Sequence, residues 1–197
     1  MIVILLSISL VLSYLIGSIP FAYLYGKLFK SIDIREHGSG NIGATNMLRV
    51  LGTKAGVLVL FLDMLKGFLP VFLAIYFFAS YEWFPVLVAI FAVLGHIFTV
   101  FLSFKGGRGV ATSAGVFLAL CPLTLLGAII IFCIVVALTR YVSLGSIIAS
   151  ISIVFGNFMF EESLYLQLFT IVVAMFIIYK HKSNIKRLIE KTENKFY

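Results

Sequence analysis

Long apolar stretches separated by short polar segments make up most of the chain. The first runs from Ile2 to Gly26 without a charged residue, and a helix needs about 20 apolar residues to cross a bilayer. The pattern predicts membrane-spanning helices at residues 2–28, 55–80, 84–104, 142–160 and 163–179. Gly17, Ser18 and Pro20 predict a kink in the first of them. Because the apolar runs are continuous and do not alternate with polar residues, they indicate helices and not a barrel.

The composition excludes a soluble protein. The 197 residues are 62% apolar and only 12% charged, whereas an average soluble domain is about 25% charged. A soluble chain of this length has too small a core to bury so many apolar side chains. Cys121 and Cys133 both lie in apolar runs, which is typical of buried thiols and not of a disulfide or metal site. We expect an all-α polytopic membrane protein, with residues 1–197 forming a single domain.

Residues 110–139 determine the expected number of crossings. One helix over this uncharged stretch would be about 45 Å long, against a hydrocarbon core of about 30 Å. The alternative is two short crossings of about 14 residues each, turning near Cys121 and Pro122.

The basic residues distinguish between these two arrangements. With two short crossings and the N-terminus outside, 14 of the 15 Lys and Arg residues lie on one side, Lys66 being the exception. The other side then holds Glu82, Glu161 and Glu162 and no basic residue. Because basic loops prefer the cytoplasm, we expect about seven crossings, two of them short, with the N-terminus outside and the C-terminus inside.

The first candidate site follows the first span. Gly38, Gly40 and Gly43 match a dinucleotide-binding pattern, but a membrane helix precedes them where that pattern needs a strand. Ala44 stands where a P-loop requires lysine. Both nucleotide interpretations therefore fail. Converging backbone N–H groups and a helix that starts near Gly43 still suit an anion.

Polar side chains follow these glycines. Thr45, Asn46 and Arg49 lie within about one turn of the expected helix, and Thr45 and Arg49 share one face of it. The segment predicts an anion site on the cytoplasmic side. A glycine-rich turn that caps an interfacial helix is the structural alternative.

A second glycine-rich segment precedes the uncharged stretch. It consists of Lys105, Gly106, Gly107, Arg108 and Gly109, with Thr112 shortly after. Two cations separated by glycines and leading into a helix N-terminus predict a second anion site. Flanking positive charge at the membrane surface is the alternative, which explains the cations but not the three glycines.

Three ionisable residues lie inside expected spans. Asp63 and Lys66 are three residues apart and can neutralise one another, and His96 lies in the next span. Intramembrane ionisable residues are candidates for function. A structural ion pair and a buried, hydrogen-bonded histidine are the alternatives.

The third candidate site is the basic tail. Ile185, Leu188 and Ile189 form an apolar stripe, as in an ordinary interfacial helix. His181 and Asn184 precede Ile185 and Leu188 by four residues, so they extend this inward stripe. Buried polar groups need partners, which makes the pair a candidate for ligand binding.

Other reaction classes lack their residues. The cytoplasmic carboxylates are Asp33, Glu36, Glu190 and Glu193, without the D-x-x-x-D cluster that a Mg²⁺-dependent phosphotransferase needs. No histidine is followed by the H-x-x-x-x-D pattern of acyl-CoA-type glycerolipid acyltransferases, and no Ser-His-Asp set is evident.

Three segments resemble the motifs of the bacterial acyl-phosphate:glycerol-3-phosphate acyltransferases. They are Ser39-Gly-Asn-Ile-Gly-Ala-Thr-Asn46, the stretch from Gly95-His96 to Thr112, and the tail from His181 through Asn184-Ile to Arg187-Leu188. They occur in the family's order and spacing, and the hydropathy matches across essentially the whole chain.

The resemblance implies a reaction and a set of residues. Such an enzyme moves a fatty acyl group from acyl phosphate to the 1-position of glycerol 3-phosphate, giving lysophosphatidate and phosphate in the first step of phospholipid synthesis. The family's proposed mechanism is substrate-assisted and forms no acyl-enzyme. The positions that match substrate-phosphate residues are Ser39, Arg49, Arg108, His181 and Asn184. Those that shape the phosphate-binding loops are Gly40, Asn41, Gly43, Thr45, Asn46, Lys105, Gly106, Gly107 and Gly109.

Three positions depart from the family's pattern. Arg108 stands where the family usually has lysine, and a bidentate arginine is a capable phosphate ligand. Thr99 replaces a common proline, and Ser183 replaces a common glutamate.

The resemblance also implies the protein's surroundings. It implies a multi-pass protein of the bacterial inner membrane whose active site faces the cytoplasm, with membrane lipid around it, no cofactor, no metal and no nucleic acid. Its partners would be the two phosphorylated substrates and, as a further candidate, the enzyme that forms the acyl phosphate. On the residues alone, a transporter for a phosphorylated small anion and a non-catalytic lipid-binding scaffold stay as alternatives.

Overall fold

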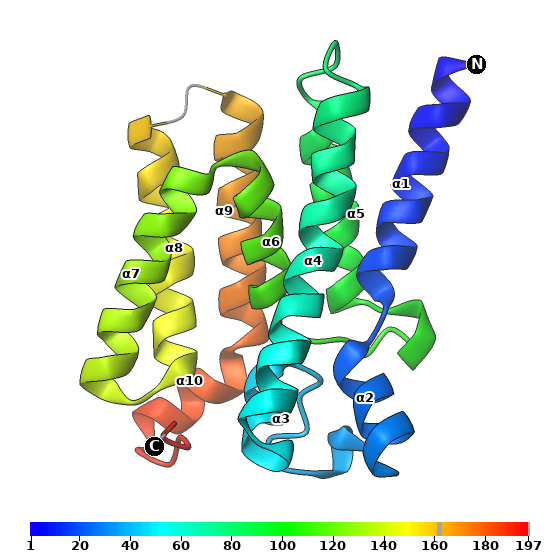
Figure 1. The fold of residues 1–197 in the computed structure, drawn as a ribbon. Helices are drawn as coiled ribbons and strands as arrows, with labels where there is room; N and C mark the ends of the chain where they lie inside the picture. Colours follow the sequence, from blue (N-terminus) through cyan, green and yellow to red (C-terminus); the bar gives the residue numbers. More distant parts are fainter. Residues whose placement is uncertain (161–162, 197) are drawn as a thin grey trace. The chain divides into compact units, whose positions relative to one another are not determined.

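The computed structural model describes residues 1–160 and 163–196, and within them every regular element is a helix. The chain forms two compact units, Met1–Leu120 and Cys121–Tyr197. The first unit contains α1 (Ile2–Ser18), α2 (Phe21–Lys30), the 3₁₀ turn η1 (Ile34–Glu36), α3 (Ala44–Leu51), α4 (Thr53–Phe77), α5 (Phe84–Ile97), the 3₁₀ turn η2 (Val100–Leu102) and α6 (Val110–Leu120). The second contains α7 (Pro122–Thr139), α8 (Val142–Phe160), α9 (Leu164–Lys180) and α10 (Lys182–Ile189) (Figure 1).

The expected all-α membrane architecture is confirmed. Four segments are long and apolar enough to cross a bilayer, namely Thr53–Phe77, Phe84–Leu102, Pro122–Thr139 and Val142–Phe160. Two bent helix pairs, α1 with α2 and α9 with α10, raise the number to six if each pair is one span. Many of the exposed side chains in these helices are large and apolar, as expected for contact with lipid.

The stretch 110–139 divides as expected, but unequally. The turn falls at Cys121, so α6 has 11 residues and α7 has 18. The expected length of about 14 residues for each segment was therefore wrong, because Pro122 occupies the first position of α7 and places the break closer to the start of the stretch. At 1.5 Å per residue, α6 is about 16 Å long, roughly half of the hydrocarbon core.

The kink expected in the first span is a break between α1 and α2. The two helices meet at 46° across Ile19 and Pro20. Side chains from later helices supply donors to the carbonyl groups at this break. Thr99 Oγ1 donates to the Ser18 carbonyl at 2.5 Å, and Lys66 Nζ donates to the Ile19 carbonyl at 2.7 Å. Buried backbone acceptors in a membrane need such partners.

Glycines allow the helices of the first unit to approach closely. A Cβ atom on Gly67 of α4 would collide with the Thr112 carbonyl of α6, and one on Gly115 of α6 would collide with the Met64 carbonyl of α4. A similar approach joins α1 and α5 at Gly17 and Gly95. Small residues at helix interfaces are a common means of association in lipid, where van der Waals packing replaces the hydrophobic effect.

We predict that Gly115→Ala lowers the stability of the protein, because its methyl group meets backbone that cannot move aside. The expected cost of such overpacking is about 1–3 kcal/mol. Gly127→Ala is a matched control, since nothing lies within 4 Å of a Cβ at Gly127 of α7. Thermal unfolding of the two purified variants in detergent compares them directly. Equal midpoints would contradict the proposed close contact of α4 and α6.

Candidate functional site

The loop before α3 is fixed by Asn46, whose side chain is almost fully buried. Asn46 Oδ1 accepts a hydrogen bond from the backbone N–H of Ser39 at 2.8 Å. Its Nδ2 donates to the carbonyls of Ile34 at 3.2 Å and His37 at 3.0 Å. One amide group therefore ties together both sides of the loop, and Asn46 shapes the loop from within.

Two glycines permit this loop conformation. Gly38 and Gly40 have φ values of +61° and +70°, a region that residues with a Cβ rarely adopt. A Cβ on Gly38 would strike the side chain of Asn46, and one on Gly40 would lie 3.0 Å from the Arg35 carbonyl. The turn is therefore tight as well as left-handed.

The loop leaves a polar surface in front of a helix N-terminus. Ser39 and Gly40 are exposed, while Asn41, Thr45 and Arg49 are half-buried. Gly43 is extended and α3 begins at Ala44, as the sequence predicted. The first N–H groups of α3 and the side chains of this segment form an arrangement that can receive an anion.

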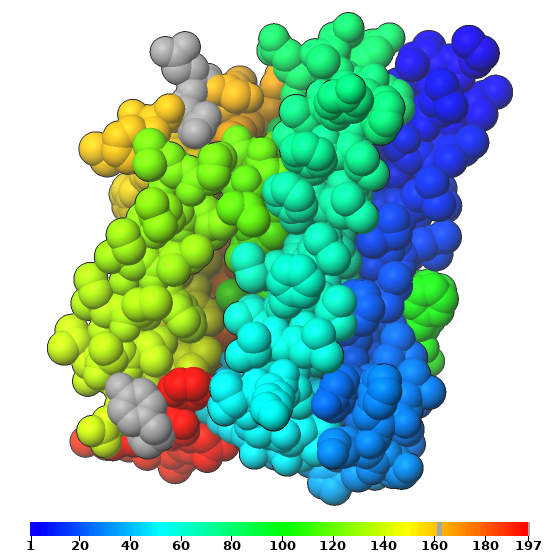
Figure 2. Space-filling model, viewed as in Figure 1, coloured from blue at the N-terminus to red at the C-terminus, as the bar shows by residue number. Residues whose placement is uncertain are grey.

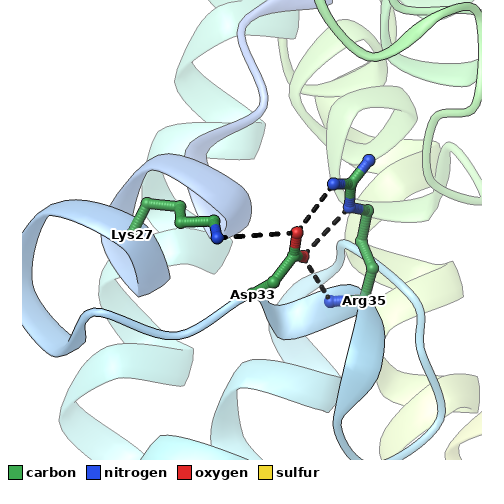
Figure 3. Close-up of polar contacts among 3 residues, drawn as sticks. All are labelled: Lys27, Asp33 and Arg35. Atoms are coloured by element: carbon green, nitrogen blue, oxygen red, sulfur yellow. Dashed lines mark hydrogen bonds and ion pairs between the residues drawn. The ribbon is translucent and has the colours of Figure 1, made fainter.

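An ion cluster that the sequence analysis did not single out precedes the loop (Figure 3). Asp33 Oδ1 accepts from the backbone N–H and Nε of Arg35, each at 3.0 Å, and Oδ2 accepts from the second guanidinium nitrogen at 2.7 Å. Lys27 Nζ lies 3.9 Å from Oδ2. The hydrogen bond from the Arg35 side chain is the main cause that lowers the pKa of Asp33 to about 2. The only sequence signal was an acidic residue two positions before an arginine, typical of a short capped turn.

The second glycine-rich segment folds back onto the end of α5. The N–H groups of Gly106 and Gly107 donate to the carbonyls of Ile97 and His96, both at 3.1 Å. These two amides are thus used within the protein. The segment presents the exposed Lys105 and the half-buried Arg108 instead, directly before α6. Its capacity for an anion therefore lies in the cationic side chains.

The three ionisable residues of the spans lie together. Lys66 Nζ is 2.7 Å from Asp63 Oδ1, and His96 Nδ1 is 3.9 Å from the same oxygen. All three side chains are almost fully buried. A Cβ on Gly107 would strike the imidazole of His96. This group therefore contacts two other features: Lys66 bonds to the break after α1, and His96 packs against the second glycine-rich segment.

In the second unit, His181 and Asn184 are buried at the start of α10, as the sequence predicted. His181 Nδ1 lies 2.7 Å from the Ile177 carbonyl. Since a carbonyl only accepts, Nδ1 must carry the proton in this contact. The prediction that Ile189 belongs to the inward apolar stripe was wrong, because its side chain is 77% exposed at the end of α10.

Glu193 is a second residue that sequence reasoning missed. Its Oε1 accepts from Asn184 Nδ2 at 2.6 Å and from Ser143 Oγ at 2.8 Å, and its Oε2 accepts from Arg187 Nε at 2.7 Å. Burial opposes ionisation of this carboxyl, but the hydrogen bonds from Asn184, Arg187 and Ser143 outweigh it and lower the pKa. The carboxylate fixes one end of the Asn184 amide. Asn184 Oδ1 has no hydrogen-bond partner among the described residues.

Among the described residues, no group of three His, Cys, Asp or Glu side chains is placed to hold a metal ion. The arrangement instead offers two cationic segments in the first unit and a fixed His–Asn pair in the second. Such groups can bind phosphorylated ligands.

The family profile for glycerol-3-phosphate acyltransferases matches residues 7–191. The chain belongs to the glycerol-3-phosphate acyltransferase family. A relative of that name from Bacillus subtilis (strain 168) is 48% identical over 191 residues, which cover 97% of each chain. Another, from Fusobacterium nucleatum, is 48% identical over 187 residues, or 95% of this chain and 96% of the relative.

Solved structures of the family have the same fold. A crystal structure described as an integral membrane glycerol 3-phosphate acyltransferase in its glycerol 3-phosphate form has a TM-score of 0.94 and 42% identity, covering 98% of this chain and 96% of that one. The lysophosphatidic acid form has a TM-score of 0.90 and 41% identity, covering 96% and 94%. The present chain is accordingly an integral membrane protein of this acyltransferase family.

We predict that Glu193→Gln destabilises the protein by about 1–3 kcal/mol, because the amide cannot accept all three hydrogen bonds that the carboxylate accepts. The pKa of Glu193 is lower in the folded protein, so its stabilising effect is complete above the ordinary value of 4.5 and is lost as the pH falls below it. Unfolding midpoints measured from pH 7 down to pH 3 should differ above pH 4.5 and draw together below it for the wild type and the variant.

The control for this experiment is Glu190→Gln. Glu190 lies 3.8 Å from Lys186 in an exposed pair, and such pairs contribute little. A similar loss of stability in both variants would contradict the role given to Glu193.

Proposed function

We propose that this protein transfers a fatty acyl group from acyl phosphate to the 1-position of glycerol 3-phosphate. The observation that carries the proposal is the pair of cationic, glycine-shaped segments in a membrane protein of the glycerol-3-phosphate acyltransferase family. Both substrates of this reaction carry a phosphate group, so each of the two segments could bind one of them. The products are lysophosphatidate and phosphate.

The first segment supplies Ser39, Arg49 and the N–H groups at the start of α3. Asn46 and the two left-handed glycines give the loop one conformation before substrate arrives, which reduces the entropy cost of binding. We assign Ser39 and Arg49 to direct contact with a substrate phosphate. Gly43, Thr45 and Asn41 complete the loop.

The second segment supplies Lys105 and Arg108. The glycines between and after them bind the chain to the end of α5 and let it turn into α6. We assign Arg108 to a substrate phosphate, where its planar guanidinium can bind two oxygens at once. We also assign His181 and Asn184 of the second unit to substrate binding.

The reaction needs no nucleophile from the protein. The oxygen of the 1-hydroxyl group of glycerol 3-phosphate attacks the acyl carbon, the bond from that carbon to the phosphate oxygen breaks, and the departing phosphate takes the hydroxyl proton. The scarcity of cytoplasmic carboxylates supports this substrate-assisted path, because few side chains are available as a general base. Positioning and stabilisation of negative charge then supply most of the rate.

The distribution of charge supports a membrane orientation. We propose seven crossings with the N-terminus outside, the half-length α6 being one of them, in a bacterial inner membrane with the site on the cytoplasmic side. We also propose that residues 1–197 act as one acyltransferase domain, since the family match extends over both units. The enzyme that forms the acyl phosphate is a proposed partner.

We predict that the purified protein forms lysophosphatidate from acyl phosphate and glycerol 3-phosphate, and that acyl-CoA does not replace the donor. Activity should persist with a chelator present. Radiolabelled glycerol 3-phosphate and thin-layer chromatography measure the product. Product formed only from acyl-CoA would overturn the proposed donor. Accumulation of unchanged glycerol 3-phosphate in vesicles without any product would favour a transporter.

We further predict that Ser39→Ala and Arg49→Ala each reduce turnover about 100-fold or more, the loss expected when a group that stabilises developing charge is removed. Both variants should insert into the membrane and elute as one species in gel filtration, because neither side chain is fully buried. Lys186→Ala is the control, since its side chain is 76% exposed on α10. Rates like those of the wild type in both site variants would refute the assignment.

A further inference from the structure

We propose that Asp33 and Arg35 are positioning residues that hold the Ser39 loop in its binding conformation. This inference deepens the proposed function and rests on it, because it assumes that the loop binds a phosphorylated substrate. Arg35 contacts the loop through its backbone carbonyl, Asp33 holds Arg35, and neither residue is assigned a contact with substrate. They lie before the glycine-rich segment, in and next to η1.

The ion pair gives η1 a rigid shape. Asp33 accepts hydrogen bonds from the backbone N–H of Arg35 and from two nitrogens of its guanidinium group, so the carboxylate closes the turn on itself (Figure 3). Two parallel hydrogen bonds of this kind specify geometry as well as charge. The guanidinium carbon also lies 4.9 Å from the centre of the Tyr23 ring on α2. The turn is thereby attached to a helix.

Arg35 transmits this attachment to the loop. Its carbonyl oxygen lies only 3.0 Å from the position that a Cβ on Gly40 would take, so the two chain segments are in close contact. Gly40 is the neighbour of Ser39. A shift of the Arg35 backbone therefore displaces the residue next to the proposed phosphate ligand.

A second attachment joins the turn and the loop to α3. Asn46 of α3 donates to the carbonyls of Ile34 and His37 and accepts from the N–H of Ser39. The turn and loop are thus attached to α2 through the contact of the Arg35 guanidinium with the Tyr23 ring, and to α3 through one amide. Figure 2 shows the side chains of α2 (blue) beside those of α3 and the start of α4 (cyan), at the lower end of the first unit in this view.

The exposure of Ser39 explains why such support is needed. An exposed loop without it samples many conformations, and ordering it on each binding event costs affinity. A catalytic group must stay within about 0.5 Å of its productive position. A displacement of about 1 Å far from the chemistry can cost about 100-fold in rate.

Asp33→Asn and Arg35→Lys test the inference with little change in volume. The first removes the charge that pairs with the guanidinium, and the second removes the planar fork but keeps the positive charge. Lys27→Met is the matched control, because Lys27 Nζ lies 3.9 Å from Asp33 and its side chain is 44% exposed. All three are made in the full-length protein and assayed with acyl phosphate and glycerol 3-phosphate.

We expect both test variants to raise the KM of one phosphorylated substrate about 10- to 100-fold, as loss of positioning does, and to leave the KM of the other unchanged. Lys27→Met should retain the KM values of the wild type. A merely structural role would lower the active fraction and hence kcat, with both KM values unchanged, and that result overturns the inference. Direct binding by Arg35 predicts that Asp33→Asn, which releases the guanidinium, leaves or lowers the KM, which also overturns it.

A measurement without turnover separates this inference from the proposed function. A spin label at His37→Cys, with Cys121 and Cys133 replaced by alanine, reports the motion of the loop. We expect a more mobile spectrum with Asp33→Asn and Arg35→Lys than with Lys27→Met. An unchanged spectrum overturns the positioning role even if the enzyme is active. Absence of acyl transfer by the wild type refutes the proposed function, while the spectra still decide on the loop.

Discussion

Every backbone carbonyl and N–H group inside a bilayer needs a partner within the protein, and the fold of the first unit follows from this constraint. An unbroken helix meets it without help, whereas a break exposes acceptors that side chains or distant amides must satisfy. The carbonyl of Ser18 receives Thr99, and that of Ile19 receives Lys66. At the end of α5 the carbonyls of His96 and Ile97 receive the amides of the second glycine-rich segment.

The spans could be predicted because hydropathy depends only on composition over about 20 residues. The bounds of α8, Val142–Phe160, agree with the sequence prediction, and the break near Cys121 was also expected. The unequal lengths of α6 and α7 could not be obtained in this way, because hydropathy is uniform across residues 110–139. A proline at a helix start sets the division locally.

The candidate site was predictable where its chemistry depends on neighbouring residues. The Ser39 loop and the start of α3 show this, since glycines and a helix N-terminus are visible in the sequence. The roles of Asp33 and Glu193 could not be predicted, because each depends on contacts that exist only in the folded chain. The Ser143 partner of Glu193 is 50 residues away in the chain, and no local pattern indicates such a contact.

The bond from Lys66 to Ile19 has a consequence for biosynthesis. The two residues are 47 positions apart, and Ile19 leaves the ribosome before α4 does. Until α4 has been made and enters the bilayer, the Ile19 carbonyl must rely on water or on the insertion machinery for its hydrogen bond. The bend between α1 and α2 therefore acquires its permanent partner only after a later segment is delivered, which makes membrane integration of this chain an ordered event.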